Sequence, residues 1–272
     1  MYQVPDTAPI EDRAICDLVN QGLDPRQLFR AAYSFRRQQL EEQCSREGRL
    51  VVETGLFEGM HLYPKSLASQ LMPKVQGTYE KEVQDYIFGN KMRFDRFLDV
   101  GCAEGFYLSG IARWKRVPCF GVDIDPTSES AVDFVAKKNG VQDMISFSKR
   151  IESISSFLIG SPLCLVDVDG AEFEVLRALN QLLDSVATLR AVLLIVETDC
   201  AVSGGQNTFE LIASLVGSGW RVETIISQDP RNRFVGSNFQ LSFLDQVAIG
   251  AEGRYAEQCW IVARKIFAHK KM

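Results

Sequence analysis

The chain has 272 residues, of which 46% are hydrophobic and 24% are charged. These fractions are typical of a soluble globular protein and exclude disordered, collagen-like and coiled-coil chains. Thirty basic residues against 35 acidic ones give a formal net charge of −5, so the composition does not favour nucleic acid as a partner. A chain of this length can bury about three quarters of its surface and build a substantial core.

Seven cysteines are scattered along the chain without a CxxC pair, and only two histidines accompany them. Several of the cysteines lie in apolar runs, which is typical of reduced, buried thiols. We therefore expect a cytoplasmic protein without a zinc site. The first residues lack the apolar run of a signal peptide, and the longest apolar stretch, 191–196, is too short to span a bilayer. No membrane association is expected.

Two parts of the chain differ in pattern. Residues 1–73 are first polar and helix-favouring and then rich in Gly and Pro, so we expect a helical N-terminal extension with a covering loop. Residues 74–272 are expected to form the main domain. Between Ile10 and Arg46 the apolar spacing predicts two amphipathic helices that are broken near residues 22–25. Any homo-oligomer is expected to form through these helices.

From residue 97 onward, seven short apolar runs alternate with helix-like stretches. This alternation predicts an α/β fold with a doubly wound, mainly parallel seven-stranded sheet that is covered on both faces. The expected strands span residues 97–100, 119–122, 145–147, 163–166, 192–196, 222–226 and 260–263. The expected helices lie near residues 78–88, 105–114, 127–139, 171–184 and 208–217. A polar connection over residues 227–257 shows no helix-like stretch, so the last strand is free to insert antiparallel.

A glycine-containing turn follows the first of these strands, at the position where doubly wound sheets bind ligands. Gly101 allows the chain to turn tightly, and Gly105 allows the next helix to approach the sheet. Asp123 ends the following strand. A carboxylate at that place can accept hydrogen bonds from both hydroxyls of a ribose. The pattern therefore predicts a nucleoside-binding site.

The residue types in this turn indicate which nucleoside is bound. A dinucleotide site needs bare backbone amides, and hence glycine at the third position of the motif, where this chain has Ala103. Glu104 and the nearby Asp99 add negative charge, which would repel a pyrophosphate. A ligand with an amino group, a sulfonium charge and no phosphate fits better. These features favour S-adenosylmethionine over a nicotinamide cofactor.

Three stretches resemble the class I S-adenosylmethionine-dependent methyltransferases, and most closely their FkbM-type branch. They are Asp-Val-Gly-Cys-Ala-Glu-Gly-Phe-Tyr at 99–107, Gly-Val-Asp-Ile-Asp at 121–125 and Val-Asp-Val-Asp-Gly-Ala-Glu-Phe-Glu-Val-Leu at 166–176. Gly-Thr-Tyr-Glu at 77–80 and Leu-Ile-Val-Glu-Thr at 194–198 also fit. The resemblance covers about residues 74–226 and implies a Rossmann-like methyltransferase fold. The sequence departs from the branch at Asp169, where Glu is more common.

The resemblance also implies which residues hold the cofactor. Asp99, Gly101 and Gly105 would surround its methionine end, and Asp123 would hold the ribose. Tyr79 and Glu80 would close over the cofactor, although a helix-packing aromatic is an equal alternative at Tyr79. The implied cofactor-binding set, including those residues that would edge the adenine, is Tyr79, Asp99, Gly101, Cys102, Glu104, Gly105, Asp123, Ile124, Arg150 and Ile151.

Carboxylates at the ends of the fourth and fifth strands are candidates for catalysis. Asp167 and Glu197 are expected at the same sheet edge as Gly101, where one of them can take the proton of an acceptor hydroxyl. A divalent cation such as Mg²⁺ that orients a hydroxylated acceptor is an alternative. In a third interpretation, Asp167 and Asp169 cap the following helix. The candidate substrate contacts are Asp169, Glu172 and His61.

Together these features predict an S-adenosylmethionine-dependent methyltransferase that transfers a methyl group in line to an oxygen atom of a small hydroxylated or sugar-like acceptor. The oxygen acceptor follows from the resemblance alone. One alternative is an RNA or protein methyltransferase that uses the N-terminal helices for recognition. Another is a non-catalytic cofactor-binding or interaction protein. Arg231 and Arg233 are interpreted either as partners of an anionic acceptor or as part of a solvated loop.

Overall fold

The computed structural model describes residues 10–22, 24–67, 69–89, 93–198, 206–233, 241–252 and 258–267. The described strands are β1 Arg96–Val100, β2 Cys119–Val122, β3 Ile145–Ser148, β4 Pro162–Val166, β5 Ala191–Thr198, β6 Arg221–Ser227 and β7 Cys259–Ile266. The described α-helices are α1 Ile10–Asn20, α2 Pro25–Arg46, α3 Leu71–Gln76, α4 Lys81–Gly89, α5 Phe106–Lys115, α6 Ser128–Lys138, α7 Glu172–Ser185, α8 Gln206–Gly217 and α9 Phe243–Gly250. Short 3₁₀ helices are η1 Gln142–Met144, η2 Ile151–Ser156 and η3 Pro230–Arg233.

The strands form one sheet in the order β3-β2-β1-β4-β5-β7-β6. β1 to β5 pair in parallel, since helical connections return the chain to the start of each next strand. β7 instead inserts antiparallel between β5 and β6. β1 and β4 lie side by side where the strand order reverses. In sheets of this kind a crevice for ligands opens beyond the carboxyl ends of those two strands.

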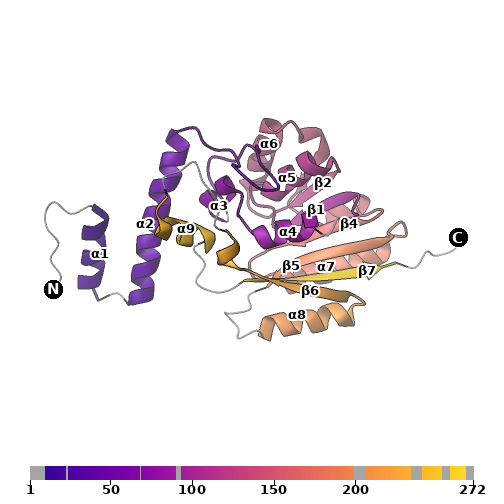
Figure 1. Cartoon of the computed structure of the whole chain (residues 1–272). Helices are drawn as coiled ribbons and strands as arrows, with labels where there is room; N and C mark the ends of the chain where they lie inside the picture. Colours follow the sequence, from indigo (N-terminus) through magenta and orange to yellow (C-terminus); the bar gives the residue numbers. More distant parts are fainter. Residues whose placement is uncertain are drawn as a thin grey trace.

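Helices cover both faces of the sheet, as near-continuous apolar strands require (Figure 1). On one face α5 contributes Leu108 and Ile111 to a core that also includes α3, α4 and α6. On the other face α7 and α8 contribute Leu179 and Leu215. Complete burial of such a side chain stabilises the fold by about 1.5–3 kcal/mol. The two cores therefore hold the strand ends, and the residues that follow them, in fixed positions.

The strands and helices expected in the sheet domain all occur, with ends that differ by a few residues. The doubly wound, mainly parallel seven-stranded sheet is confirmed, and its last strand is antiparallel. The interpretation of residues 227–257 as a connection without helix is wrong, because η3 and α9 form there. Ser242 begins α9 in a capping box with Asp245, in which each side chain accepts the other residue's backbone N–H.

The two predicted N-terminal helices are present as α1 and α2. α1 packs against α2 and lies away from the sheet, whereas α2 also contacts α3 and α9 (Figure 1). Leu40 and Cys44 of α2 are buried in the same apolar core as α5. Arg36 of α2 ion-pairs with Asp245 of α9, with 2.8 Å between Nε and Oδ1. The domain division at residue 73 stays a prediction, but α2 shares its core and an ion pair with the main domain.

The described cysteines differ in oxidation state. Free thiols occur at Cys16, Cys44, Cys102, Cys119 and Cys164. Cys259, at the start of β7, is disulfide-bonded. The expectation of reduced cysteines is therefore wrong at this one described position, and Cys200 lies outside the described residues. Among the helices in the described part of the chain, none is both long enough and apolar enough to cross a membrane.

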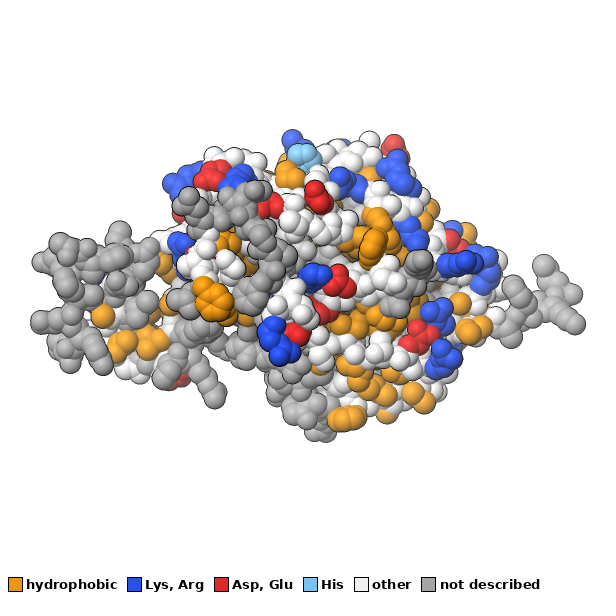
Figure 2. Space-filling model, in the orientation of Figure 1, with side chains coloured by type: hydrophobic (Ala, Val, Ile, Leu, Met, Phe, Trp, Pro, Cys, Tyr) orange, Lys and Arg blue, Asp and Glu red, His pale blue; other side chains and the backbone are white. Residues whose placement is uncertain are grey.

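The surface in Figure 2 mixes basic and acidic side chains over most of its described area. Apolar side chains gather over α8, where Phe209 and Val216 are 74% and 57% exposed. The opposite side of α8 buries Leu211 and Leu215 against the sheet. α8 is therefore apolar on two sides, unlike a covering helix with one apolar stripe.

Candidate functional site

The turn after β1 approaches the end of β4 closely. Gly101 has a φ of +89°, and a Cβ atom there would lie 1.6 Å from the carbonyl oxygen of Asp167. Gly105 has a φ of +79° and packs against Val132 of α6. Side chains other than glycine rarely adopt such angles, and at Gly101 no side chain would fit. The glycine motif therefore forms a tight backbone turn at the central carboxyl edge of the sheet.

Asp123 follows β2, and its carboxylate is bound to this same turn. Oδ2 accepts a hydrogen bond from the N–H of Ala103 at 2.7 Å, and Oδ1 accepts one from the N–H of Asp125 at 2.8 Å. Ala103 has a φ of 45°, in the left-handed region. Backbone donors thus hold the carboxylate beside the glycine turn, which is the place where a ribose-binding acid is required.

The expected adenine contacts lie at the ends of β2 and β3, which are neighbours in the sheet. Ile124 is 87% exposed, a high exposure for a side chain directly after a buried strand. Arg150 precedes η2, and its exposed guanidinium pairs with Glu152, with 3.4 Å between Nε and Oε2. Ile151 packs against the core on the α7 face of the sheet. The apolar surface available to an adenine is therefore that of Ile124.

A cavity of about 280 Å³ opens beside the glycine turn. It brings together seven of the predicted site residues: Tyr79, Asp99, Gly101, Cys102, Asp167, Asp169 and Glu197. Glu80, which was expected to close over the cofactor, also lines it, together with residues that were not predicted, including Arg37, Gln70, Lys74, Glu252 and Gln258. One space thus combines the residues expected around the methionine end of a cofactor with those expected to be catalytic.

Asp99 lines this cavity and is 2% exposed. Burial raises its pKa well above the ordinary value of 3.8, and the nearby charges of Asp167, Glu80 and Asp123 raise it further. A cation placed against Asp99 would favour its ionised form. The methionine end of S-adenosylmethionine carries an ammonium and a sulfonium charge, so the residues present fit that group.

Cys102 and Tyr79 line the cavity as packed side chains. Burial raises the pKa of the Cys102 thiol well above its ordinary value, so this thiol is not a reactive thiolate. The Tyr79 ring meets the Phe106 ring edge-on, with 5.4 Å between the ring centroids. The interpretation of Tyr79 as a packing aromatic therefore holds, and because the ring also forms part of the cavity wall, closure over the cofactor stays a prediction.

Glu104 interacts differently from what the sequence suggested. Its buried carboxylate ion-pairs with Lys74 and accepts hydrogen bonds from Ser66 Oγ at 3.2 Å and from the Leu67 N–H at 3.3 Å. Burial alone would raise the pKa of Glu104, but the Lys74 charge and the hydrogen bonds outweigh it and lower that pKa. The expected repulsion of a pyrophosphate by Glu104 is therefore wrong, because Lys74 neutralises this carboxylate.

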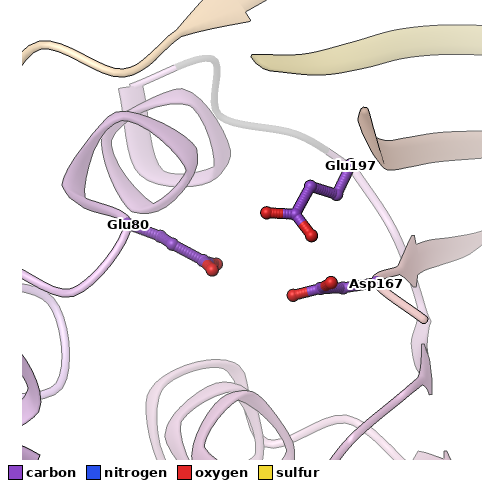
Figure 3. Close-up of side chains that lie close together, drawn as sticks. All are labelled: Glu80, Asp167 and Glu197. Atoms are coloured by element: carbon purple, nitrogen blue, oxygen red, sulfur yellow. The ribbon is translucent and has the colours of Figure 1, made fainter. Parts of the chain in front are cut away.

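Three carboxylates converge on one side of the cavity (Figure 3). Glu80 precedes α4, Asp167 follows β4 and Glu197 lies in β5, and their carboxylates point toward one another. One oxygen atom from each lies within 4.8 Å of the other two. Like charges at this separation repel one another, so the cluster favours a bound cation or a shared proton. We call these three residues the carboxylate cluster.

Glu80 has a backbone conformation that is rare for glutamate. Its φ is 45°, and such a conformation costs roughly 1–3 kcal/mol and persists only where surrounding contacts enforce it. Its Oε2 accepts the hydroxyl of Tyr107 at 3.0 Å, and its N–H donates to Glu252 at 2.8 Å. The sequence signal was the Tyr-Glu pair at 79–80, which did not indicate that Glu80 meets the two catalytic candidates.

A second cavity, of about 200 Å³, shares Asp169 and Glu197 with the first. Glu172 of α7 also lines it. The N-cap of α7 is Ala171, whose side chain makes no capping hydrogen bond. Asp167 and Asp169 do not occupy the N-cap position of α7, and both line cavity walls.

The structure does not bring His61 into the candidate site. His61 forms a bridge with Val51 in the loop before α3. Its N–H donates to Asn139 Oδ1 at 2.9 Å, and its carbonyl accepts from Asn139 Nδ2 at 2.8 Å. His61 is exposed and lines neither cavity. This position gives no support to a substrate contact through His61.

Two basic residues of the described part of the chain line the first cavity, and no sequence pattern indicated either of them. Lys74 belongs to the short helix α3, and Arg37 belongs to α2 in the N-terminal extension. The side of a helix that faces a site becomes known only when the helix is packed. The N-terminal extension thus contributes a cation to the cavity wall.

Arg231 and Arg233 lie in the same 3₁₀ helix but in different surroundings. The Arg231 side chain is 87% exposed and pairs with Asp229, with 2.8 Å between Nε and Oδ1. The Arg233 side chain is 0% exposed and pairs with Glu82 and Glu252. The solvated-loop interpretation therefore holds for Arg231 only, and neither arginine lines the first cavity.

No protein-family model matches the sequence, and no curated protein matches it. Several solved structures are similar in fold. An S-adenosylmethionine-dependent methyltransferase from Geobacter sulfurreducens in complex with S-adenosylhomocysteine is 17% identical over 68% of this chain and 90% of that chain, with a TM-score of 0.42. A precorrin-6y C5,15-methyltransferase from Geobacter metallireducens is 10% identical over 68% and 88%, with a TM-score of 0.45. The [4+2]-cyclase SpnF is 14% identical over 70% and 84%, with a TM-score of 0.46.

The chain has a Rossmann-like α/β fold, with an antiparallel strand inserted next to the end of a mainly parallel sheet. The structures to which it is similar include an S-adenosylmethionine-dependent methyltransferase and a precorrin-6y methyltransferase. What this chain binds depends on its own side chains.

Proposed function

We propose that the protein is an S-adenosylmethionine-dependent methyltransferase of the FkbM type that methylates an oxygen atom of a small hydroxylated or sugar-like acceptor. The observation that carries this proposal is that the turn at Gly101 and the carboxylate cluster line the same cavity. The turn offers a backbone that a cofactor can approach closely, and the cluster offers proton acceptors beside it. O-methyl transfer requires both.

Two aspartates would hold the cofactor at opposite ends. Asp99 would pair with the positive charges of the methionine end, and Asp123 would accept hydrogen bonds from the ribose hydroxyls. The exposed Ile124 side chain would pack on the adenine. When bound, the cofactor supplies a methyl group on a sulfonium, so the methyl group is already activated for transfer.

Asp167 and Glu197 would act on the acceptor. One of the two accepts the hydroxyl proton of the acceptor as the oxygen becomes methylated. The walls of the first cavity hold the reacting atoms in line, and such positioning can supply up to about 7–11 kcal/mol of the barrier. The second cavity, which Asp169 and Glu172 line, offers carboxylate oxygens as acceptors for further hydroxyl groups. These features favour a small polyhydroxylated acceptor.

The carboxylate cluster also allows a metal-assisted variant of the same reaction. Oxygen atoms from Glu80, Asp167 and Glu197 lie close enough to one another to surround one ion, and carboxylate oxygens are the ligands that Mg²⁺ prefers. In this variant the ion would orient the acceptor hydroxyl and lower its pKa. Activity with Mg²⁺ compared with activity in EDTA distinguishes the two variants.

The first test measures ligand binding by thermal unfolding. Wild-type protein is heated with S-adenosylmethionine, S-adenosylhomocysteine or NAD, beside Asp123→Ala and the control Asp133→Ala, which alters an exposed aspartate on α6. A ligand at about 100 times its dissociation constant stabilises the fold by roughly 2.7 kcal/mol. We expect this shift with the first two ligands in the wild type and the control, and its loss in Asp123→Ala. Stabilisation by NAD alone, or by none of the three, contradicts the proposal.

The second test identifies the acceptor atom. Release of S-adenosylhomocysteine is measured with a panel of sugars and polyols and with matched amino compounds, each with Mg²⁺ and with EDTA. Mass spectrometry then locates the methyl group in the product. Methylation of nitrogen, or activity only with RNA or a polypeptide, would show that the acceptor class is wrong while leaving the donor intact.

A further inference from the structure

The buried guanidinium of Arg233 connects two segments that border the candidate site. Its side chain is 0% exposed, although it belongs to a short 3₁₀ helix in the long connection between β6 and β7. Removing a guanidinium from water costs several kcal/mol unless carboxylates with good geometry compensate for it. The position of Arg233 is therefore tied to that of its partners.

Arg233 pairs with two glutamates at once. Its Nε lies 3.0 and 3.2 Å from the two carboxylate oxygens of Glu82, and its Nη2 pairs with the same carboxylate. Its Nη1 pairs with Glu252 and donates to the carbonyl of Gly250 at 3.4 Å. Glu82 lies in the first turn of α4, and Glu252 follows α9. The planar guanidinium thus fixes α4 and the end of α9 relative to each other.

Glu252 links Arg233 to Glu80, which lines the cavity. The oxygen that pairs with Arg233, Oε1, also accepts the backbone N–H of Glu80 at 2.8 Å. Glu252 itself lines the cavity. The chain around Glu80 therefore has two anchors, Glu252 at its own N–H and Glu82 two residues later. The same guanidinium holds both anchors.

Glu80 is the residue that needs such anchors. Its φ of 45° lies in a region that only surrounding contacts can enforce for a non-glycine residue. In this conformation its carboxylate points at Asp167 and Glu197 (Figure 3). A change of φ to the usual negative range would redirect the side chain away from the carboxylate cluster.

We propose that Arg233 is a positioning residue, which acts through Glu82 and Glu252 to hold the backbone of Glu80 and so keep the Glu80 carboxylate in the carboxylate cluster. Its importance for methyl transfer rests on the proposed function, whereas its effect on Glu80 does not. The apolar cores of the sheet do not involve the guanidinium, so a conservative change at Arg233 should alter the site more than the fold.

The test is a double-mutant cycle with S-adenosylhomocysteine as the probe, measured by titration calorimetry. Arg233→Lys keeps the charge but loses the planar fork, and Arg231→Lys makes the same change at the exposed neighbour. Glu80 shares the cavity with Asp99 and, unlike Asp167 and Glu197, is expected to close over the cofactor. We therefore expect Arg233→Lys to weaken binding about ten-fold, or roughly 1.4 kcal/mol, and Arg231→Lys to leave it unchanged. In a Glu80→Gln background, the effect of Arg233→Lys should fall below about two-fold, because the residue through which it acts is already altered. Equal losses in both backgrounds, or no loss in the wild type, overturn the proposal.

A crystal structure of Arg233→Lys provides a readout that does not depend on the cofactor. We expect Glu80 to leave the left-handed region and its carboxylate to leave the cluster. An unchanged Glu80 conformation overturns the proposal, whether or not the wild type binds S-adenosylhomocysteine. Failure of the wild type to bind S-adenosylhomocysteine contradicts the proposed function instead. Should Arg233→Lys fail to fold, Glu82→Gln weakens the Arg233–Glu82 ion pair by changing the glutamate. The same loss of binding and the same change in the Glu80 conformation are then expected.

Discussion

The ammonium group of Lys74 lies 4.8 Å from the centre of the Tyr79 ring while it ion-pairs with the carboxylate of Glu104. Three segments thus meet at one charged centre in the cavity wall, namely α3, the glycine turn and the residues before α4. Lys74 is 3% exposed and Glu104 is 4% exposed. Each charge therefore depends on the other to compensate for its burial.

Replacing Lys74 by Met should destabilise the fold, because it leaves the Glu104 charge buried without its main partner. The expected loss is about 3–5 kcal/mol in the free energy of unfolding, measured by urea denaturation. The double variant Lys74→Met/Glu104→Gln should recover most of that loss, since no buried charge remains. Losses that simply add in the double variant would show that the two side chains act independently.

The same ion pair makes a prediction for acid pH. The pKa of Glu104 is lowered from the ordinary value of 4.5 in the folded protein. A lowered pKa means that the pair's contribution to stability is complete above 4.5 and is lost as the pH falls through the folded value. The stability difference between wild type and Lys74→Met should therefore shrink in strong acid. A difference that stays constant from neutral to strongly acid pH contradicts this assignment.

Asp99→Asn should stabilise the unliganded protein at neutral pH and weaken cofactor binding. The pKa of Asp99 is raised in the folded state, so wild-type stability falls as the pH rises above 3.8 toward the folded value. The variant lacks this penalty, and each kcal/mol gained raises the melting temperature by about 2–4 °C. The gain should vanish near pH 4. Asp133→Asn, at an exposed site, serves as the control and should show no such pH-dependent gain.

Gly101→Ala should destabilise the fold and abolish cofactor binding. Gly170→Ala is the control that separates backbone strain from steric overlap. Both glycines have positive φ, but a Cβ atom at Gly170 meets nothing within 4 Å, whereas at Gly101 it would lie 1.6 Å from the Asp167 carbonyl. Backbone strain costs about 1–2 kcal/mol in each variant, and overpacking adds roughly 1–3 kcal/mol at Gly101 only. Binding of S-adenosylhomocysteine should be lost in Gly101→Ala and kept in Gly170→Ala. Equal stability losses would show that the close approach is unimportant.

Of Asp167→Asn and Glu197→Gln, the variant that removes the acceptor of the hydroxyl proton should lower the rate of methyl transfer by about 10²–10⁴-fold. The affinity for S-adenosylhomocysteine should change much less, because Asp99 and Asp123 are expected to hold the cofactor. The pH–rate profile should lose its acidic limb in the variant that lacks the base. Full activity in both variants would remove these residues from the mechanism.

The sheet and its glycine turn were predictable because they depend on local patterns. Apolar runs such as Leu163 to Val166 have one plausible place in a covered sheet, and Gly101 and Asp123 follow directly from their strands. The helix α9 was missed because only eight residues form it. Ser242, with an acidic residue three positions later, is nevertheless a sequence signal for the start of this helix.

The ion pairs of Lys74 and Arg233 at the site could not be predicted from the sequence. Lys74 and Arg233 are polar residues in short helical segments, where periodicity does not tell which side faces inward. Both are buried and form ion pairs with carboxylates from distant parts of the chain, such as Glu104 and Glu252. Only the packed fold brings these charges together, so the pattern left Arg233 either as a partner of an anionic acceptor or in a solvated loop, and it is neither surface-exposed nor in the first cavity.

The place of β7 in the sheet bears on how the protein is made. β6 pairs with β7 and with no other described strand, and β7 also completes the edge of β5. As the chain emerges during synthesis, β6 therefore has no neighbour, and the hydrogen-bonding edge of β5, beside Glu197, stays open until residues 259–266 have been made. Nascent chains that stop before β7 would expose two strand edges to pairing with other chains. Completion of the sheet, and of the wall that carries Glu197, thus waits until β7 has been made.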